Sequence, residues 1–88
     1  MKAYKALINK VLADGHTVSV WDGEEWQVKR STSPKAIAEA IESVDEAQIR
    51  VRSVDGKVIG WALIIPYLDD GEDVADYTDN AYMNSFLS

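Results

Sequence analysis

A run of carboxylates near the end of the chain, LDDGEDVADYTDN at residues 68–80, is the first candidate for chemistry. Clustered carboxylates can bind a divalent cation, and an EF-hand calcium loop places oxygen ligands at its first, third and fifth positions, glycine at the sixth and glutamate at the twelfth. A loop that starts at Asp69 has Gly71 third, and one that starts at Asp70 has Val74 fifth. No register fits, so we predict no metal site in this run.

Catalytic groups are scarce in the rest of the chain. His16 lies near Asp14 and Ser19, so a triad can be drawn, but the same residue types suit a helix end, a turn and a surface strand. The chain contains no cysteine, which excludes thiolate nucleophiles, disulfides and cysteine-based zinc sites. Neither the GxGxxG nor the GxxxxGKS/T phosphate-binding pattern occurs. We therefore predict a protein that is not an enzyme and that uses no cofactor.

The formal net charge of -6 is concentrated at the C-terminal end. Residues 1–68 contain nine acidic and nine basic residues, whereas residues 69–88 contain six acidic residues and no basic one. Such an asymmetry bears on partners and solubility rather than on fold. One interpretation is that the acidic residues only keep a small protein soluble. The other, which we adopt, is a contact with the basic surface of a partner protein. The predicted contact residues are Asp69, Asp70, Glu72, Asp73, Asp76, Tyr77 and Asp79.

A second surface offers the chemistry of single-stranded nucleic-acid binding. Trp21, Lys29, Arg50 and Arg52 are expected on one face of a sheet, where an indole ring can stack on a base and cations can pair with phosphates. Against this, charged residues fill the solvent side of any antiparallel sheet, one aromatic residue alone is expected there, and the net charge repels phosphate. Nucleic-acid binding on this face, regulated by the acidic segment, is therefore the alternative function.

Three helices are expected to position these groups. Apolar residues recur at helical spacing over residues 4–12, and Gly15 stands where a glycine ends a helix. Ser33 and Pro34 begin a second helix, as N-cap and as first-turn residue. The segment DYTDNAYMNSFL predicts a short third helix, whose apolar positions are Tyr82, Met83, Phe86 and Leu87.

The first pair of strands flanks the turn residues Asp22 and Gly23. A loop one residue longer than this pair places Val20 opposite Trp26, and it gives the hairpin one apolar face. Trp21 then points to the other face.

The second pair of strands flanks a three-residue loop, VDG at residues 54–56. This loop places Ile49 opposite Trp61, so Trp61 and Leu63 are expected in the core. Pro66 ends the last strand, because proline cannot donate to a sheet ladder.

Together these elements predict an α+β fold in one domain, residues 1–88, with the acidic segment at residues 69–88. The order is α-β-β-α-β-β with a short C-terminal helix. We expect a four-stranded antiparallel sheet with the helices on one face and the other face open. An open face or an unpaired strand edge would also allow a homodimer. We expect no signal peptide and no membrane span, and hence a cytoplasmic protein.

The chain as a whole, and the stretches VSVWDGEEW and DVADYTDNAYM in particular, resembles the small, acidic, cysteine-free accessory proteins of tailed bacteriophages. Several proteins of that class inhibit host defence or host nucleic-acid enzymes by presenting carboxylates in place of DNA phosphates. The resemblance implies an inhibitor of a host protein that acts in the bacterial cytoplasm. Known mimics are acidic throughout, whereas residues 1–68 are neutral here, so any mimicry is confined to the C-terminal segment.

Overall fold

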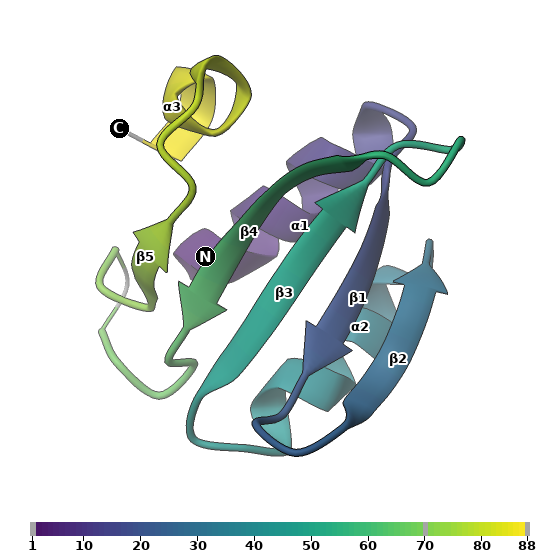
Figure 1. The fold of residues 1–88 in the computed structure, drawn as a ribbon. Helices are drawn as coiled ribbons and strands as arrows, with labels where there is room; N and C mark the ends of the chain where they lie inside the picture. Colours follow the sequence, from purple (N-terminus) through teal and green to yellow (C-terminus); the bar gives the residue numbers. More distant parts are fainter. Residues whose placement is uncertain (1, 70, 88) are drawn as a thin grey trace.

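The computed structural model describes residues 2–69 and 71–87, which form three helices and five strands (Figure 1). In chain order the elements are α1 (Ala3–Ala13), β1 (Thr17–Trp21), β2 (Trp26–Ser31), α2 (Pro34–Glu42), β3 (Ala47–Arg52), β4 (Val58–Ile64), β5 (Val74–Tyr77) and α3 (Ala81–Leu87). This order confirms the predicted α+β class. None of the described helices has the length and apolar composition that crossing a membrane requires.

The strands form one antiparallel sheet in the order β2-β1-β3-β4-β5. The prediction of four strands is wrong, because part of the acidic segment forms β5 at the sheet edge. Along β5, Tyr77 lies opposite Ala62 and Asp76 lies opposite Leu63. Val74 and Tyr77 of β5 pack against the core. The strand therefore has an apolar side, which the surrounding carboxylates hide in the sequence.

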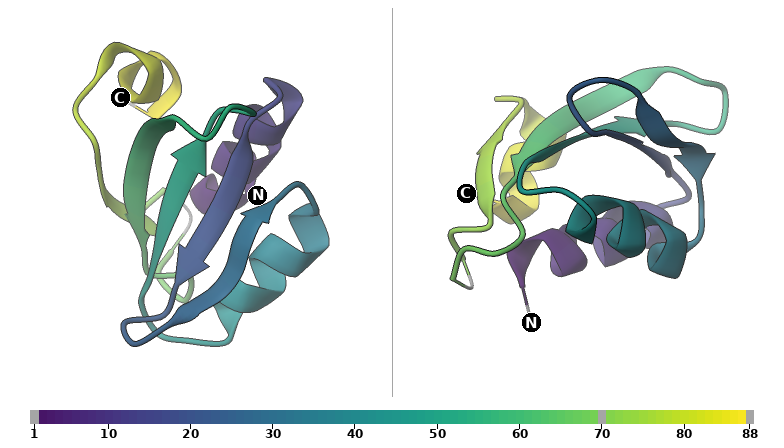
Figure 2. Two further views of the ribbon diagram at one scale, coloured as in Figure 1. Left: turned by 45° about the vertical axis from the view of Figure 1, so that its right-hand side comes forward. Right: turned by 90° about the horizontal axis from the view of Figure 1, so that it is seen from below.

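Helices α1 and α2 cover one face of the sheet and leave the other face open (Figures 1 and 2). The covered face holds the core, whose buried side chains are Tyr4, Leu7, Ile8, Val11, Val18, Val20, Ile37, Ile41, Ala47, Ile49, Val51, Ala62, Ile64 and Met83. Burying a Val, Leu, Ile or Met side chain stabilises a fold by about 1.5–3 kcal/mol. The predicted apolar face of α1 is confirmed.

Both predicted helix boundaries are confirmed in atomic detail. Gly15 has a φ of 86°, which is the left-handed conformation that favours glycine, and the His16 N–H donates to the Val11 carbonyl at 3.0 Å. The hydroxyl of Ser33 accepts a hydrogen bond from the Ala36 N–H at 3.2 Å. Pro34 follows at the first helical position, where its missing N–H is not needed.

The register of the first hairpin differs from the prediction. Trp26 lies opposite Trp21, not opposite Val20, which instead faces Val28. Two irregularities on β2 account for the difference, because each adds one residue to β2 relative to β1. Residues directly opposite each other share a face of the sheet, so Trp26 stands with Trp21 on the open face rather than in the core.

The carboxylate of Asp22 determines the shape of this hairpin loop. It accepts hydrogen bonds from the backbone N–H groups of Glu24 and Glu25, both at 2.8 Å, and from the Gln27 amide. The Glu25 N–H, followed by the Glu24 N–H, holds the pKa of Asp22 below its usual range. The loop is thus longer than the predicted turn, and it starts β2 at Trp26.

The register of the second hairpin is also different, and the prediction that Trp61 is buried is wrong. Next to the loop, Arg52 lies opposite Val58, as the predicted turn requires, but Val51 lies opposite Gly60. Ile59 is therefore an extra, bulged residue. A shift of one residue exchanges the two faces of a strand, so Gly60 and Ala62 face the core. Trp61, 38% exposed, stands on the open face.

Contacts from the C-terminal segment maintain this bulge. The amide of Asn80 donates to the Ile59 carbonyl at 2.9 Å, and the Trp61 N–H donates to the Thr78 hydroxyl at 2.8 Å. Met83 of α3 fills the space over Gly60: a Cβ atom on Gly60 would lie 2.9 Å from Met83 Cγ. A residue without a side chain can face the core here because Met83 supplies the missing volume.

Candidate functional site

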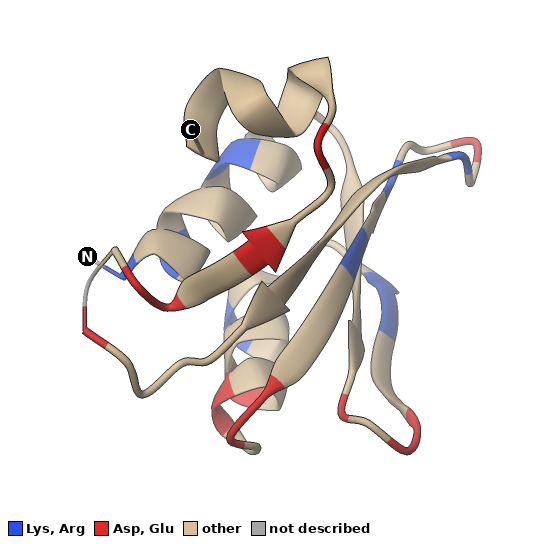
Figure 3. Ribbon diagram, turned by 60° about the vertical axis from the view of Figure 1, so that its left-hand side comes forward, with Lys and Arg blue, Asp and Glu red and all other residues tan. Residues whose placement is uncertain are grey.

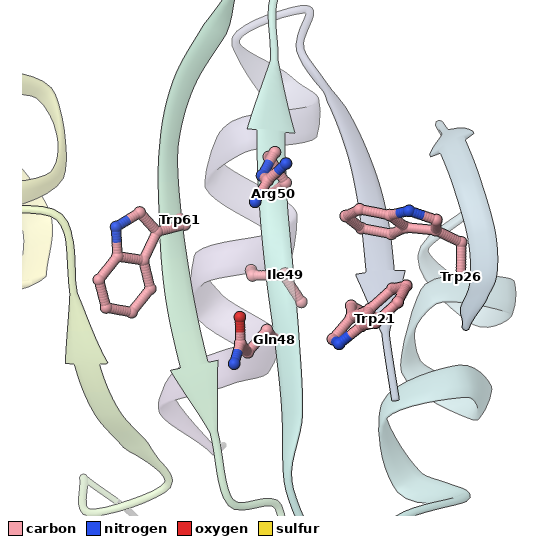
Figure 4. A pocket seen from close by; sticks show the side chains of 6 residues that line it. All are labelled: Trp21, Trp26, Gln48, Ile49, Arg50 and Trp61. Atoms are coloured by element: carbon pink, nitrogen blue, oxygen red, sulfur yellow. The ribbon is translucent and has the colours of Figure 1, made fainter. Parts of the chain in front are cut away.

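All three tryptophans of the chain lie on the open face of the sheet, on both sides of β3 (Figure 4). Trp21 and Trp26 come from the facing ends of β1 and β2. Trp61 comes from β4, where it lies opposite Arg50 of β3. Three indole rings on a face that no helix covers form an aromatic surface available to a ligand.

Two ring interactions hold part of this surface in place. Trp21 and Trp26 form an edge-to-face pair with ring centroids 5.2 Å apart. The Arg50 guanidinium carbon lies 5.4 Å from the centroid of the Trp26 ring. Aromatic pairs of this kind contribute about 0.5–1.5 kcal/mol, and an exposed cation–π contact contributes about 0.5–1 kcal/mol. A ligand would therefore meet rings that are already oriented, which reduces the entropy lost on binding.

A hollow of about 280 Å³ lies between the Trp21–Trp26 pair and Trp61. Gln48 and Arg50 of β3 line it between the rings, as Figure 4 shows. Within the described part of the chain, the Gln48 amide and the Arg50 guanidinium have no hydrogen-bond or ion-pair partner. Their donors, and the amide oxygen of Gln48, are free for a ligand.

A second hollow, of about 320 Å³, continues from the first toward β2 and is lined by four cations: Lys29, Arg30, Arg50 and Arg52. Lys29 and Arg30 are adjacent in sequence and would point to opposite faces of a regular strand. The irregular pairing of β2 lets both line this hollow. Arg30 has a φ of 50°, a left-handed conformation that costs a residue other than glycine about 1 kcal/mol.

The buried hydroxyl of Ser19 connects these strands. It accepts one hydrogen bond from the Arg30 N–H at 2.8 Å and one from Arg52 Nη1 at 3.3 Å. Strained backbone persists only where its surroundings determine it, and it is concentrated at functional sites. The Arg30 conformation therefore supports the basic hollow as part of a site.

On the strands themselves, charge changes from basic on β2 and β3 to acidic on β5, and further acidic residues lie in the loop between β1 and β2 (Figure 3). The cations of the second hollow lie on β2 and β3, whereas Asp76 lies on β5 at the far edge. Asp76 and Leu63 line a smaller hollow beside Trp61. The open face is thus locally basic although the chain is acidic, because the carboxylates of the C-terminal segment lie at and beyond one edge.

The structure brings together the four residues predicted for a nucleic-acid face, Trp21, Lys29, Arg50 and Arg52. Sequence reasoning missed Trp26, Trp61 and Arg30, because each owes its place to an irregular strand pairing. The sequence did contain an indication for Trp61. If Trp61 is buried, its neighbours Gly60 and Ala62 must face solvent, and such small residues are unusual on an exposed strand face.

Comparison with family models, with curated proteins and with solved structures finds no match. The resemblance to phage accessory proteins stays a prediction.

The acidic residues predicted to contact a partner are dispersed. Asp73 is fully buried, which leaves its carboxylate no surface to offer a partner. Tyr77 is half-buried against the core, and Asp70 lies outside the described residues. The exposed members of the set are Asp69, Glu72, Asp76 and Asp79.

Asp73 has a structural role at the start of α1. One carboxylate oxygen accepts from the Tyr4 N–H at 2.7 Å, and the other accepts from the N–H groups of Ala3 at 3.2 Å and Gly71 at 3.1 Å. The carboxylate therefore serves as an N-cap supplied from the other end of the chain. Lys2, the local N-cap residue, makes no such side-chain bond.

The three residues of the possible catalytic triad, Asp14, His16 and Ser19, do not form one group. His16 packs edge-to-face against Tyr82 of α3, and the Tyr82 hydroxyl donates to the Asp14 carboxylate at 2.6 Å. Ser19 is instead bonded to Arg30 and Arg52. Among the described residues, no three His, Asp or Glu side chains are grouped closely enough to hold a metal ion.

Proposed function

We propose that the open sheet face binds single-stranded nucleic acid. The observation that supports this function is the placement of three tryptophans beside four cations on one uncovered face. Bases of a single strand stack on aromatic side chains, and cations along the same groove pair with the phosphates. The sequence favoured this function less, because it placed only Trp21 among the cations.

The chemistry of the hollow argues against other ligands of an aromatic surface. A quaternary ammonium or methylated lysine binds between rings, but here Arg50 occupies the same space and would repel a cation. A planar, uncharged group with hydrogen-bond acceptors suits the free donors of Gln48 and Arg50. A nucleobase has these properties, and its phosphates would lie toward the basic hollow on β2 and β3.

The net charge of -6 does not prevent such binding, because the acidic segment forms the opposite edge of the sheet. Phosphate pairing depends on local cations, and it weakens steeply with salt. We expect a strand to cross from β2 toward β4 and to stop before Asp76 of β5. The carboxylates at that edge would then limit the length of the binding site.

Fluorescence titration of the intact protein with a fluorescein-labelled twelve-nucleotide single strand tests this function. At low salt we expect binding that quenches the tryptophans and weakens as salt is added. Trp61→Ala should weaken binding about 5- to 150-fold, since stacking on one base contributes about 1–3 kcal/mol. Tyr67→Ala is the matched control and should leave affinity unchanged, because the Tyr67 hydroxyl donates to the Glu42 carbonyl at the end of α2, away from the open face.

Charge is tested by a second matched pair. Lys29→Ala removes a cation from the basic hollow, whereas Lys35→Ala removes one from α2 on the covered side of the sheet. Lys29→Ala should weaken binding, and it should reduce by about one the slope of the logarithm of the binding constant against the logarithm of the salt concentration. Lys35→Ala should change neither quantity. Absence of binding at low salt, or equal effects of the two lysines, would refute the proposed function.

The exposed acidic residues support a second candidate function, a contact with the basic surface of a partner protein. The specific observation is that Tyr67, 66% exposed, and Leu68, 39% exposed, lie beside Asp69 and Glu72 on the loop between β4 and β5. Apolar groups with flanking charge are typical of protein contacts. If Asp69→Asn with Glu72→Gln leaves capture of a partner from bacterial lysate unchanged, this candidate is wrong.

A further inference from the structure

The hollow between Trp21 and Trp61 has the dimensions of a site for one base. Trp61 lies opposite Arg50, and Trp21 lies opposite Gln48, so the two rings stand on strands that flank β3. Two strand spacings and an offset of two residues along β3 separate their backbones, about 12 Å in all. A planar ring needs about 3.5 Å on each side for van der Waals contact, about 7 Å in all. One base can therefore enter between the rings with one edge directed at β3.

Gln48 and Arg50 are placed to contact that edge. They are two residues apart on β3, so both side chains stand on the open face (Figure 4). The guanidinium offers a fork of donors and no acceptor, whereas the amide offers an acceptor as well as donors. Arg52, by contrast, already donates to Ser19 and is less free to contact a base.

The donor and acceptor order of this pair separates guanine from adenine, thymine and uracil, and ring size separates it from cytosine. Guanine presents N7 and O6, two adjacent acceptors that match an arginine fork, and then the N1–H, a donor that the Gln48 oxygen can accept. Adenine presents its N6 amino donor where guanine has O6, so it would oppose the Arg50 donors. Thymine and uracil have no two adjacent acceptors on one edge. Cytosine presents O2 and N3 beside its N4 amino donor, but its single ring covers less of an indole than the fused rings of guanine and stacks more weakly.

We infer that this hollow selects guanine from a single strand, with Arg50 bonded to N7 and O6 and Gln48 bonded to N1–H. The inference rests on the proposed function and specifies it further, since stacking on tryptophan alone does not discriminate strongly among bases. Because the recognised edge belongs to the base, single-stranded DNA and RNA should both show the preference.

A set of twelve-nucleotide strands that differ at one central position tests the inference. The background is thymidine, and the central base is guanine, adenine, cytosine or thymine. We expect the guanine strand to bind about 5- to 150-fold tighter than the adenine and thymine strands, the range for one bidentate contact, and tighter than the cytosine strand by a smaller factor. Inosine, which keeps N7, O6 and N1–H, should bind like guanine, whereas 7-deazaguanine, which lacks the N7 acceptor, should lose most of the preference. The corresponding RNA strands, in a uridine background, form the second arm.

Two variants separate base recognition from charge. Arg50→Lys keeps the cation but not the fork, so it should reduce the guanine preference to about twofold or less. The preference is a ratio of affinities within one variant, so a loss of affinity common to all four strands does not affect this reading. Lys29→Ala should lower affinity for all four strands by the same factor.

Each outcome bears on one proposal or the other. Equal binding of the four strands, tighter binding of the adenine or the cytosine strand, or full binding of 7-deazaguanine would overturn the guanine inference while leaving nucleic-acid binding in place. A preference that Arg50→Lys does not change would overturn it as well. If no strand binds, the proposed function itself fails.

Discussion

Replacing Asp73 with alanine should destabilise the whole fold, because its buried carboxylate completes the start of α1. The substitution leaves three backbone N–H groups without their acceptor, those of Ala3, Tyr4 and Gly71. Loss of a helix N-cap costs about 0.5–2 kcal/mol, and loss of a partly buried anion at a helix N-terminus costs up to about 2 kcal/mol. A buried N–H left unpaired adds about 1 kcal/mol.

We therefore expect Asp73→Ala to lower the free energy of unfolding by about 3 kcal/mol. For a chain of this length the total is about 4–13 kcal/mol. Urea unfolding followed by tryptophan fluorescence measures the change. With a slope of about 1 kcal/mol per molar urea, the midpoint should fall by about 3 M. Asp73→Asn keeps the shape and one acceptor, so it should lose about half as much.

Glu72→Gln is the matched control, because Glu72 is the exposed neighbouring carboxylate. It should change stability by no more than about 0.5 kcal/mol. If Asp73→Ala destabilises the protein by less than about 1 kcal/mol, or no more than Glu72→Gln does, the capping role assigned to Asp73 is wrong.

Two further predictions concern the packing of α3. Gly60→Ala places a methyl group 2.9 Å from Met83 Cγ and should lower the free energy of unfolding in urea by about 1–3 kcal/mol. Met83→Ala vacates that space, so adding Gly60→Ala to it should cost less. If the two changes are strictly additive, the packing of Met83 on Gly60 is wrong. Tyr82→Phe removes the hydrogen bond that is the main cause of the lowered pKa of Asp14. In the folded state this pKa lies below its ordinary value of 3.8, so the stabilisation it reports is present above that pH and is lost as pH falls through the folded value. Between pH 5 and 2.5 the free energy of unfolding, measured in urea, should therefore fall less for Tyr82→Phe than for the unchanged protein. Equal pH dependence of the two would count against the Tyr82–Asp14 bond.

Local patterns in the sequence predicted the helices well. The spacing of Leu7 and Val11, the glycine at residue 15 and the Ser33–Pro34 pair act within a few residues of themselves. Helix faces and caps depend mainly on such neighbours. The antiparallel pairing of β1 with β2 and of β3 with β4 was predictable for the same reason, since each pair flanks its own turn.

Strand register was harder to predict, because distant residues determine it. In VIGWALI, residues 58–64, both faces carry large apolar side chains, and the pattern favours Trp61 and Leu63 as the buried pair. The structure buries Gly60 and Ala62 because Met83 covers Gly60 and Asn80 bonds the bulged Ile59. The sequence of the hairpin itself does not indicate these contacts from Met83 and Asn80. The same error concealed the candidate site, since a tryptophan assigned to the core cannot be counted on a surface.

The acidic segment was misjudged for an energetic reason. Carboxylates are rarely buried, so six of them in twenty residues indicated a solvated surface. One of the six is buried against backbone N–H groups at the start of α1, where a negative charge is favourable. Nothing in the sequence near Asp73 identifies it over its neighbours, because its partners lie at the other end of the chain.

The hydrogen bond between Asp73 and Tyr4 joins residues 69 positions apart, and this separation has a consequence for how the protein is made. During synthesis α1 leaves the ribosome long before the carboxylate that completes it. Contacts between residues so far apart form late and slow the folding of small domains. We therefore expect α1 to remain frayed until most of the chain is present. A chain cut between β4 and β5 would leave both pieces incomplete, one lacking the acceptor and the other lacking its donors.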